Sequence, residues 1–240
     1  MKATYLIFLI APAAWAGADS TPAELAAQTA QTEIAQHPGF APAYARLAMA
    51  YARRAREADN ASFLDQAQDA LQKSFAVAPG NYDARKAQAF VLLGRHEWSR
   101  ALDIAIDLNK QTPDDITNYG YIADAKIALG DFDGAVEATQ WMLNLRTGNA
   151  AGLARAGRLR ELHGDYKGSL EVLQMALDAT SFGEREERAW LLTQMARVHL
   201  EGGEAKAAED STAEALAAFP GYYLAAAVRG EIATHSAGAH

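Results

Sequence analysis

The chain has 240 residues, half of them in the hydrophobic class and 22% charged, with a formal net charge of -8. This composition excludes a disordered chain, and the length allows a continuous core. The negative charge argues against general binding to nucleic acid or to anionic membranes, because both surfaces would repel it. Alanine is abundant and no run alternates apolar with polar residues as a strand would, so we expect an all-α protein.

The first 16 residues have the features of an export signal. Lys2 provides a positive charge, residues 5–11 form a short apolar segment, and Ala14-Trp15-Ala16 is a small-x-small cleavage sequence. We expect cleavage after Ala16, with a cut after Ala18 as the alternative. An uncleaved anchor is a further alternative, although the apolar run is too short to span a bilayer. The sequence has no cysteine, hence no disulfide and no thiol for lipidation. We therefore expect a periplasmic or secreted protein without stable membrane insertion.

Residues 17–40 predict a single helix, from Pro22 to Gln36. Thr21 is expected to cap it, with a proline in the first turn and Glu24 near the positive end of the helix. Pro38 is expected to end it. We interpret this helix as the second half of an incomplete repeat that caps the N-terminal end of the stack.

A period of 34 residues organises the middle of the chain. Small residues that let two helices approach closely recur along it, and each is followed twelve positions later by a residue that ends a helix. The pairs are Ala67 with Pro79, Ala101 with Pro113, Ala135 with Thr147, Ser169 with Ser181, and Ala208 with Pro220. Within the period Asp114 to Thr147, Gly130 is expected to form a turn and Asp131 to begin the second helix. Neither helix can cover its apolar face alone, so stacked neighbours are required.

These features resemble the tetratricopeptide repeat (TPR) family, in an exported bacterial form. The family has a small residue mid-way along the first helix of each unit, and this sequence has Ala48, Ala87, Ala123, Gly157 and Ala196 there. The resemblance implies an all-α fold, a right-handed TPR superhelix of antiparallel helix pairs. Its five units would span about residues 41–79, 80–113, 114–147, 148–181 and 186–220. A capping helix at residues 221–234 and a flexible tail at residues 235–240 would follow.

The sequence departs locally from the family pattern. Seven extra residues lie between the expected helices of the first unit, around Arg54 to Ala61, and two lie around His96-Glu97. Ala205 stands where an aromatic residue is usual. Five more residues near Phe182 to Glu186 are expected to form a longer connection. We expect these differences to alter loops and to leave the architecture unchanged.

Aromatic residues recur at the repeat spacing and are expected to fill the interior of each helix pair. These are Trp98, Phe132 and Tyr166. A second group fits the pattern less closely: Trp141, Trp190, Tyr222 and Tyr223. We expect these four to pack as well, with exposed contacts to a partner as the alternative.

The sequence contains no motif for catalysis, phosphate binding or metal binding. Its six histidines are scattered, and the two in the tail, His235 and His240, are too few for a defined metal site. We therefore expect a protein that is not an enzyme and that holds no cofactor or metal.

By resemblance to the family, the first helix of each unit lines a concave wall. The positions two before and one after each mid-helix small residue are expected to face it: Arg46, Met49, Arg85, Gln88, Tyr121, Asp124, Arg155, Arg158, Gln194 and Arg197. Arginine suits carboxylates because its planar fork holds both oxygens. The hypothesis is that this wall binds an extended or helical segment of another protein, whose acidic groups or C-terminal carboxylate contact the arginines. The alternative is that the arginines pair with carboxylates of adjacent helices and hold the repeats together.

Two functional classes follow from the resemblance together with the signal. The favoured one is a non-catalytic scaffold or adaptor of the bacterial cell envelope, with a protein partner and no nucleic-acid partner. The alternative is a small-ligand-binding or enzyme-accessory module that uses the same concave pocket. Self-association is a third option, because incomplete terminal units can expose apolar faces.

Overall fold

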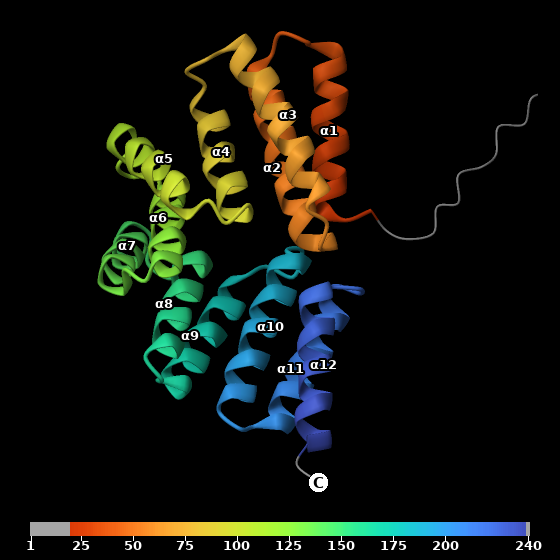
Figure 1. The fold of residues 1–240 in the computed structure, drawn as a ribbon, viewed down its shortest axis with the longest axis vertical. Helices are drawn as coiled ribbons and strands as arrows, with labels where there is room; N and C mark the ends of the chain where they lie inside the picture. Colours follow the sequence, from red (N-terminus) through yellow and green to blue (C-terminus); the bar gives the residue numbers. More distant parts are fainter. Residues whose placement is uncertain (1–19, 239–240) are drawn as a thin grey trace, which may run out of the picture.

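The computed structural model describes residues 20–238, with side chains described as far as residue 234. The expected signal peptide, residues 1–16, and both expected cleavage positions lie outside this range. All regular structure in the described residues is helical (Figure 1). The helices are α1 (Pro22–Gln36), α2 (Ala41–Ala58), α3 (Ser62–Val77), α4 (Tyr82–Gly94), α5 (Trp98–Gln111), α6 (Ile116–Leu129), α7 (Phe132–Leu145), α8 (Ala150–Leu162), α9 (Tyr166–Ala179), α10 (Arg185–Glu201), α11 (Ala205–Ala218) and α12 (Tyr223–Gly238).

Helices α2 to α11 form five consecutive pairs, and the turn within each pair has two or three residues. Helix α1 precedes the first pair and α12 follows the last. Figure 1 shows that the stack curls: α1 to α4 lie at the top, α5 to α7 at the left, and α8 to α12 at the bottom. The lower end of α2 thereby comes to face the beginning of α10.

The turns use the residues that the sequence predicted. Gly130 has a φ of 80° and ends α6, and the Asp131 side chain accepts a hydrogen bond from the Gly134 amide at 3.0 Å to begin α7. A left-handed backbone of this kind favours glycine, which has no Cβ to clash. At the N-terminus, Thr21 and Glu24 form a reciprocal capping box on α1. The predicted turn at Gly130 and the predicted cap at Thr21 are both confirmed.

Small residues line the contact between paired helices. The side chains of Ala67, Ala101, Ala135, Ser169 and Ala208 are fully buried. In the α8/α9 pair, a methyl group added to Gly157 would lie 2.7 Å from the Leu173 Cγ, and the Ser169 hydroxyl donates to the Gly157 carbonyl at 2.8 Å. The helices of this pair are therefore too close for any larger residue at position 157.

The predicted aromatic interior is only partly realised. Trp98 and Tyr166 are half-buried against core clusters, but the prediction for Phe132 is wrong. Its ring is 38% exposed and meets the His163 ring edge-on, although Phe132 begins α7 just as Trp98 begins α5 and Tyr166 begins α9.

The second aromatic group also divides. Tyr222 is fully buried, Trp190 packs in part against the same cluster, and Tyr223 is intermediate. Trp141 is about half exposed and stacks on Tyr119. The expectation of packing therefore holds for Tyr222 and fails for Trp141, whose position on α7 leaves one edge of the ring open to solvent.

The extra residues lengthen helices and do not form long loops. The segment from Arg54 to Ala61 continues α2 as far as Ala58, and the segment near Glu186 extends α10 at its beginning. The composition explains this, since RRAREA and REER are good helix formers with no glycine or proline. Helix α12 also runs to Gly238, beyond Thr234, where the flexible tail was predicted to follow.

Candidate functional site

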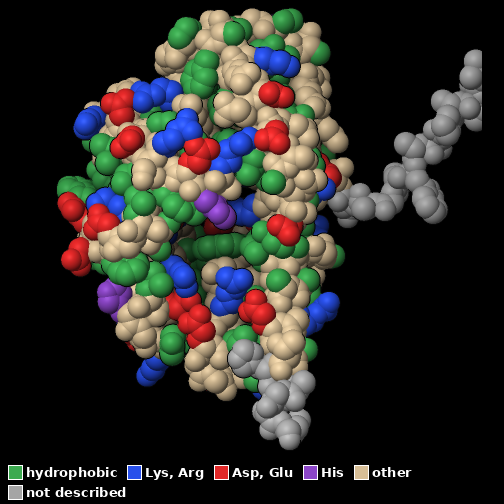
Figure 2. Space-filling view, in the orientation of Figure 1, with side chains coloured by type: hydrophobic (Ala, Val, Ile, Leu, Met, Phe, Trp, Pro, Cys, Tyr) green, Lys and Arg blue, Asp and Glu red, His purple; other side chains and the backbone are tan. Residues whose placement is uncertain are grey.

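The inner helices of all five pairs meet around one cavity of about 270 Å³. Figure 2 shows this hollow at the centre of the molecule, with hydrophobic side chains in its depth and charged side chains around it. The lining residues are Arg56 of α2, Phe90 of α4, Asp124 and Ile127 of α6, Ala154, Arg155 and Arg158 of α8, and Glu187, Trp190 and Gln194 of α10. We refer to this space as the central cavity.

Arg155 is held in place by four hydrogen bonds. Its guanidinium donates two bonds to the Asp124 carboxylate, at 2.8 and 2.5 Å, and one each to the carbonyls of Gly120 and Ala151. Burial alone would lower the pKa of the Arg155 guanidinium, but the charge of Asp124 and its hydrogen bonds raise that pKa above its ordinary value. This arginine therefore joins α6 to α8 as well as lining the cavity.

Three other predicted arginines also have carboxylate partners within the fold. Arg158 pairs with the buried Glu161 one turn along α8, Arg85 pairs with Asp107 of α5 at 2.5 Å, and Arg46 pairs with Glu33 of α1. Their charge is thus largely balanced within the fold: for Arg85 and Arg46 by a neighbouring helix, as in the intramolecular alternative, and for Arg158 by its own helix. Exposed pairs of this kind contribute little to stability.

Arg56 connects the two ends of the stack. Its guanidinium lies 2.6 Å from the Glu186 carboxylate and 3.9 Å from that of Glu187, although Arg56 and Glu186 are 130 positions apart. The Tyr222 hydroxyl donates to the other oxygen of Glu186 at 3.1 Å. Burial opposes the charge of Arg56, but the two glutamates raise its pKa above the ordinary value. We call these four side chains, Arg56, Glu186, Glu187 and Tyr222, the clasp.

Glu187, which lines the cavity, and Arg53, whose charge acts on Glu187, retain unused bonding capacity. Glu187 makes no hydrogen bond within the described residues, and burial raises its pKa, with a further increase from Glu186 against the opposing charges of Arg56, Arg155 and Arg53. Arg53, one turn before Arg56 on α2, is exposed and has neither an ion pair nor a hydrogen bond in the described part of the chain. The positive charge of Arg53 acts to lower the pKa of the Glu187 carboxyl and that of the Tyr121 hydroxyl.

The structure brings together four of the ten predicted wall residues at the cavity: Asp124, Arg155, Arg158 and Gln194. Among the others, Met49 packs against the first core cluster. Tyr121 is buried, its ring stacks on Phe90 at 6.0 Å, and burial raises the pKa of its hydroxyl. Tyr121 therefore packs within the wall and not on its surface. Gln88 and Arg197 are partly buried at positions outside the cavity lining.

Known proteins identify the fold. Neither a protein-family model nor a curated protein matches the sequence. TTC0263, a TPR protein of Thermus thermophilus, superposes with a TM-score of 0.62 at 19% identity, over 72% of this chain and 90% of that chain. A tetratricopeptide repeat protein of Parabacteroides merdae gives 0.62 at 13% identity, over 88% and 78%. PilW, a type IV pilus biogenesis factor, gives 0.57 at 15% identity, over 86% and 90%.

This chain has the TPR fold. The expected all-α, right-handed TPR superhelix is thereby confirmed. The superpositions establish the architecture alone, because the identities lie below 20%. The properties of the site follow from the side chains of this chain.

Sequence reasoning missed six residues that line the cavity: Arg56, Phe90, Ile127, Ala154, Glu187 and Trp190. A signal for the first was present, because Arg53 and Arg56 continue the face of Arg46 and Met49 at helical spacing. That face was cut short where the residues after Arg54 were interpreted as a loop. Glu187 directly follows the other segment that was interpreted as a connection, residues 182–186.

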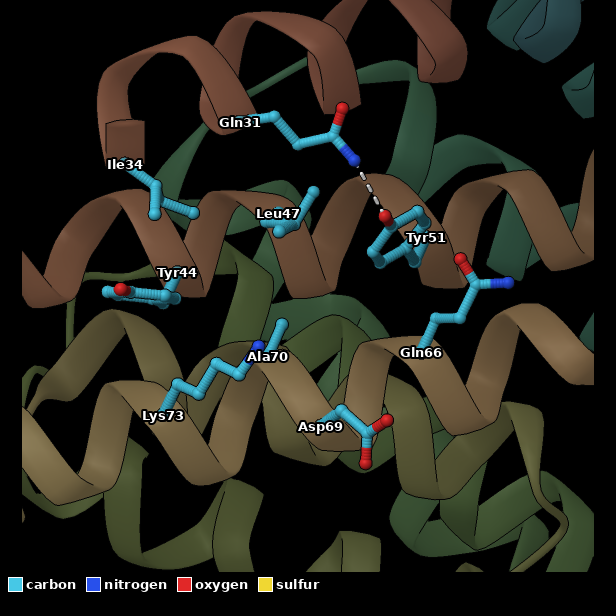
Figure 3. Close-up of a pocket in the computed structure, with 9 residues that line it drawn as sticks. All are labelled: Gln31, Ile34, Tyr44, Leu47, Tyr51, Gln66, Asp69, Ala70 and Lys73. Carbon is cyan, nitrogen blue, oxygen red and sulfur yellow. Dashed lines mark hydrogen bonds between the residues drawn. The ribbon is translucent and has the colours of Figure 1, made fainter. Parts of the chain in front are cut away.

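A second pocket lies on the opposite face of α2, between α1 and α3 (Figure 3). Its volume is about 340 Å³, and none of the predicted wall residues lines it. The Tyr44 and Tyr51 rings lie along its floor, and the Gln31 amide donates to the Tyr51 hydroxyl at 2.9 Å. Its charged lining residues, Asp69 and Lys73, are of opposite sign, so the pocket shows no preference for a charged ligand.

In residues 20–238 no helix combines the length and apolar character needed to cross a membrane. Among the side chains described, those of residues 20–234, no group of three or more histidine, aspartate or glutamate residues is placed to hold a metal ion.

The hydrogen bonds of Arg155 predict a stability effect that Arg46 does not share. Arg155→Ala should lower the free energy of unfolding by about 2 kcal/mol, because it leaves Asp124 and two carbonyls without their donor. Arg46→Ala removes an exposed pair and should change that energy by less than about 0.5 kcal/mol. Urea unfolding of both variants measures the difference. Equal effects would mean that Arg155 is no more structural than Arg46.

The raised pKa of Glu187 predicts that its charged form destabilises the fold. Because its folded pKa lies above the unfolded value, its favourable contribution is present at low pH and is lost as the pH rises through the folded pKa. Glu187→Gln should therefore raise the melting temperature at neutral pH, and the difference from the parent should vanish in acid. Thermal unfolding monitored across this pH range tests it. A variant less stable at neutral pH would show that Glu187 is stabilised by its arginines.

Proposed function

We propose that this protein is a non-catalytic interaction scaffold that binds a segment of another protein on the concave wall of its TPR stack. The observation that carries this proposal is the convergence of five inner helices on one cavity with a mixed lining. Phe90 and Trp190 offer aromatic surface, and Arg56, Arg155 and Arg158 offer guanidinium groups. Aromatic residues and arginine are the side chains most enriched where proteins bind proteins.

The charges at the cavity indicate which groups a partner would meet. Four wall arginines are already paired, so a partner acid would have to compete with Asp124, Glu161, Asp107 or Glu33. Arg53 has no such competitor among the described residues. We therefore assign the first contact with an acidic residue of the partner to Arg53, and the apolar contacts to Phe90 and Trp190.

We further propose that the scaffold acts in the bacterial cell envelope. The support is that residues 1–16 have the sequence features expected of an export signal, together with the fold likeness to PilW, a pilus biogenesis factor. N-terminal sequencing of the exported protein tests this. The mature chain should begin at Gly17, or at Asp19 for the alternative cleavage position. Recovery of the intact N-terminus from the cytoplasmic fraction alone would contradict export.

A small-ligand module is the second candidate, and one observation favours it. The clasp closes the groove, so the central cavity is partly enclosed in a way that suits a compact ligand. Native mass spectrometry of the purified protein would show a bound small molecule. A ligand displaced by Trp190→Ala would place it in this cavity and would favour this candidate over the scaffold.

Site-specific crosslinking tests the scaffold directly. A photoreactive residue in place of Gln194, which lines the cavity, should form an adduct with one dominant protein in cells. The same residue in place of Glu137, exposed on α7, serves as the control. Adducts from Glu137 but none from Gln194 would show that the working surface is elsewhere.

The same assay tests the role of Arg53. Arg53→Glu should reduce the Gln194 adduct by about tenfold, since reversing one unpaired charge at a contact costs on the order of 1–2 kcal/mol. Lys110→Glu makes the same change of charge on exposed α5 and should leave the adduct unchanged. Because Arg53 makes no ion pair or hydrogen bond within the described fold, its replacement should lower stability only through the change of charge near Glu187. Equal adduct yields from the two variants would remove Arg53 from the site.

A further inference from the structure

A further pocket adjoins the central cavity at the place where the two ends of the stack meet. Two side chains, Arg56 and Phe90, line both spaces. The pocket lies between the turn after α2, the turn after α4 and the beginning of α12, and Figure 1 shows the lower ends of α2 and α3 facing the beginning of α12. Its volume is about 460 Å³, within the range of pockets that hold small ligands. We call it the junction pocket.

Much of the lining of the junction pocket comes from segments that depart from the 34-residue period. Of its eleven lining residues, five lie in the segment from Arg54 to Ala61, and a sixth is His96 of the segment with two extra residues. The stacking of repeats requires only the periodic residues. The non-periodic residues at this pocket are therefore available for another task.

The backbone at the pocket sets the first two helix pairs apart from the others. The turns of the last three pairs have a glycine with positive φ: Gly130, Gly164 and Gly203. In the first two pairs that conformation is taken by Asp59, with a φ of 48°, and by His96, with a φ of 61°. These are the only non-glycine residues with positive φ in the described part of the chain, and both line the pocket. Because glycine is the residue best suited to this backbone, the turn alone does not explain a carboxylate and an imidazole there.

Asp59 supplies the unpaired charge of the lining. Its side chain makes neither a hydrogen bond nor an ion pair within the described fold. Arg56 also lines the pocket, but its guanidinium pairs with Glu186 at 2.6 Å. Burial raises the pKa of the Tyr223 hydroxyl, and Asp59 and Glu186 raise it further against the opposing charges of Arg56 and Arg197. The pocket therefore favours a positively charged group beside Asp59.

The rest of the lining suits an organic cation. The rings of Phe90, Tyr223 and His96 line the pocket, and the face of an aromatic ring attracts a cation. The His96 ring is held by stacking on Trp98 at 4.8 Å. Asp59 and His96 would be two ligands for a metal ion, but the described side chains include no group of three that could hold one.

We propose that the junction pocket binds a primary ammonium group on an apolar chain, with Asp59 as its counter-ion and the rings of Phe90 and Tyr223 against the chain. A free amine and the lysine side chain of a protein segment present this same group. The inference goes beyond the proposed function, because the pocket is distinct from the central cavity and its test requires no protein partner.

Nuclear magnetic resonance titration with n-pentylamine tests the site, since this molecule matches a lysine side chain from its Cα outward. At neutral pH it should shift the backbone amide signals of Asp59, Asn60 and His96, with a Kd in the millimolar range because the probe has few atoms. The neutral analogue 1-pentanol and the anion hexanoate should bind at least about tenfold more weakly, because neither forms a charge-assisted bond to Asp59.

Two variants of Asp59 separate binding from folding. Asp59→Asn removes the charge and should raise the Kd for n-pentylamine about tenfold. Asp59→Gly should raise it equally while the melting temperature stays at or above that of the parent, because glycine suits the left-handed backbone. Asp103→Asn removes a carboxylate exposed on α5 and should change neither quantity.

A blocked peptide with one lysine between glycines distinguishes the two sources of the ammonium group. Tighter binding of the peptide than of n-pentylamine would assign the group to a protein segment, and weaker binding would assign it to a free amine. Equal affinities for n-pentylamine and 1-pentanol would overturn the inference, as would an unchanged Kd in Asp59→Asn. A failed crosslink at Gln194 would count only against the proposed function.

Discussion

Close approach of neighbouring helices at small residues is the constraint on which the whole molecule depends. Ala48, Ala87, Ala123 and Ala196 in the inner helices are almost fully buried, as are their counterparts in the outer helices. A larger side chain at any of these positions would separate two helices and shift every later pair, because each unit contacts mainly its neighbours. The fixed spacing of these residues therefore determines the curvature of the stack as well as its stability.

Because the stack is curved, extra residues in α2 and α10 can bring side chains from its two ends into contact. The first and last inner helices come near each other only because three regular pairs lie between them. An added turn on α2 or α10 alone would reach into solvent, whereas the two together form an ion pair between residues 130 positions apart. Ring closure is thus a property of the complete stack, in which Arg56 and Glu186 stabilise a geometry that the intervening pairs have already set.

The predictable part of the structure is the part encoded locally. The turn at Gly130 and the helix caps at Asp131 and Thr21 could be predicted, because a turn or a cap depends only on neighbouring residues. The wall positions Asp124, Arg155, Arg158 and Gln194 followed from the repeat spacing. Arg56 was missed because it lies in a segment that breaks this spacing, and Glu187 because it directly follows one. Spacing cannot tell an inserted loop from a longer helix. The exposure of Phe132 was missed because the repeat pattern records recurrence and not burial.

The charges of the inner wall explain why an arginine-rich surface is compatible with a net charge of -8. Most wall arginines form an ion pair with a carboxylate of an adjacent helix or of the next turn of their own helix. The wall therefore presents ion pairs and few unpaired charges. A partner would gain little from replacing one ion pair with another, since each exchange also has a desolvation cost. Affinity at such a wall should therefore come mainly from apolar contact with Phe90 and Trp190. The unpaired Arg53 and the incompletely bonded Glu187 would then orient the bound segment, because neither side chain makes a hydrogen bond within the described fold.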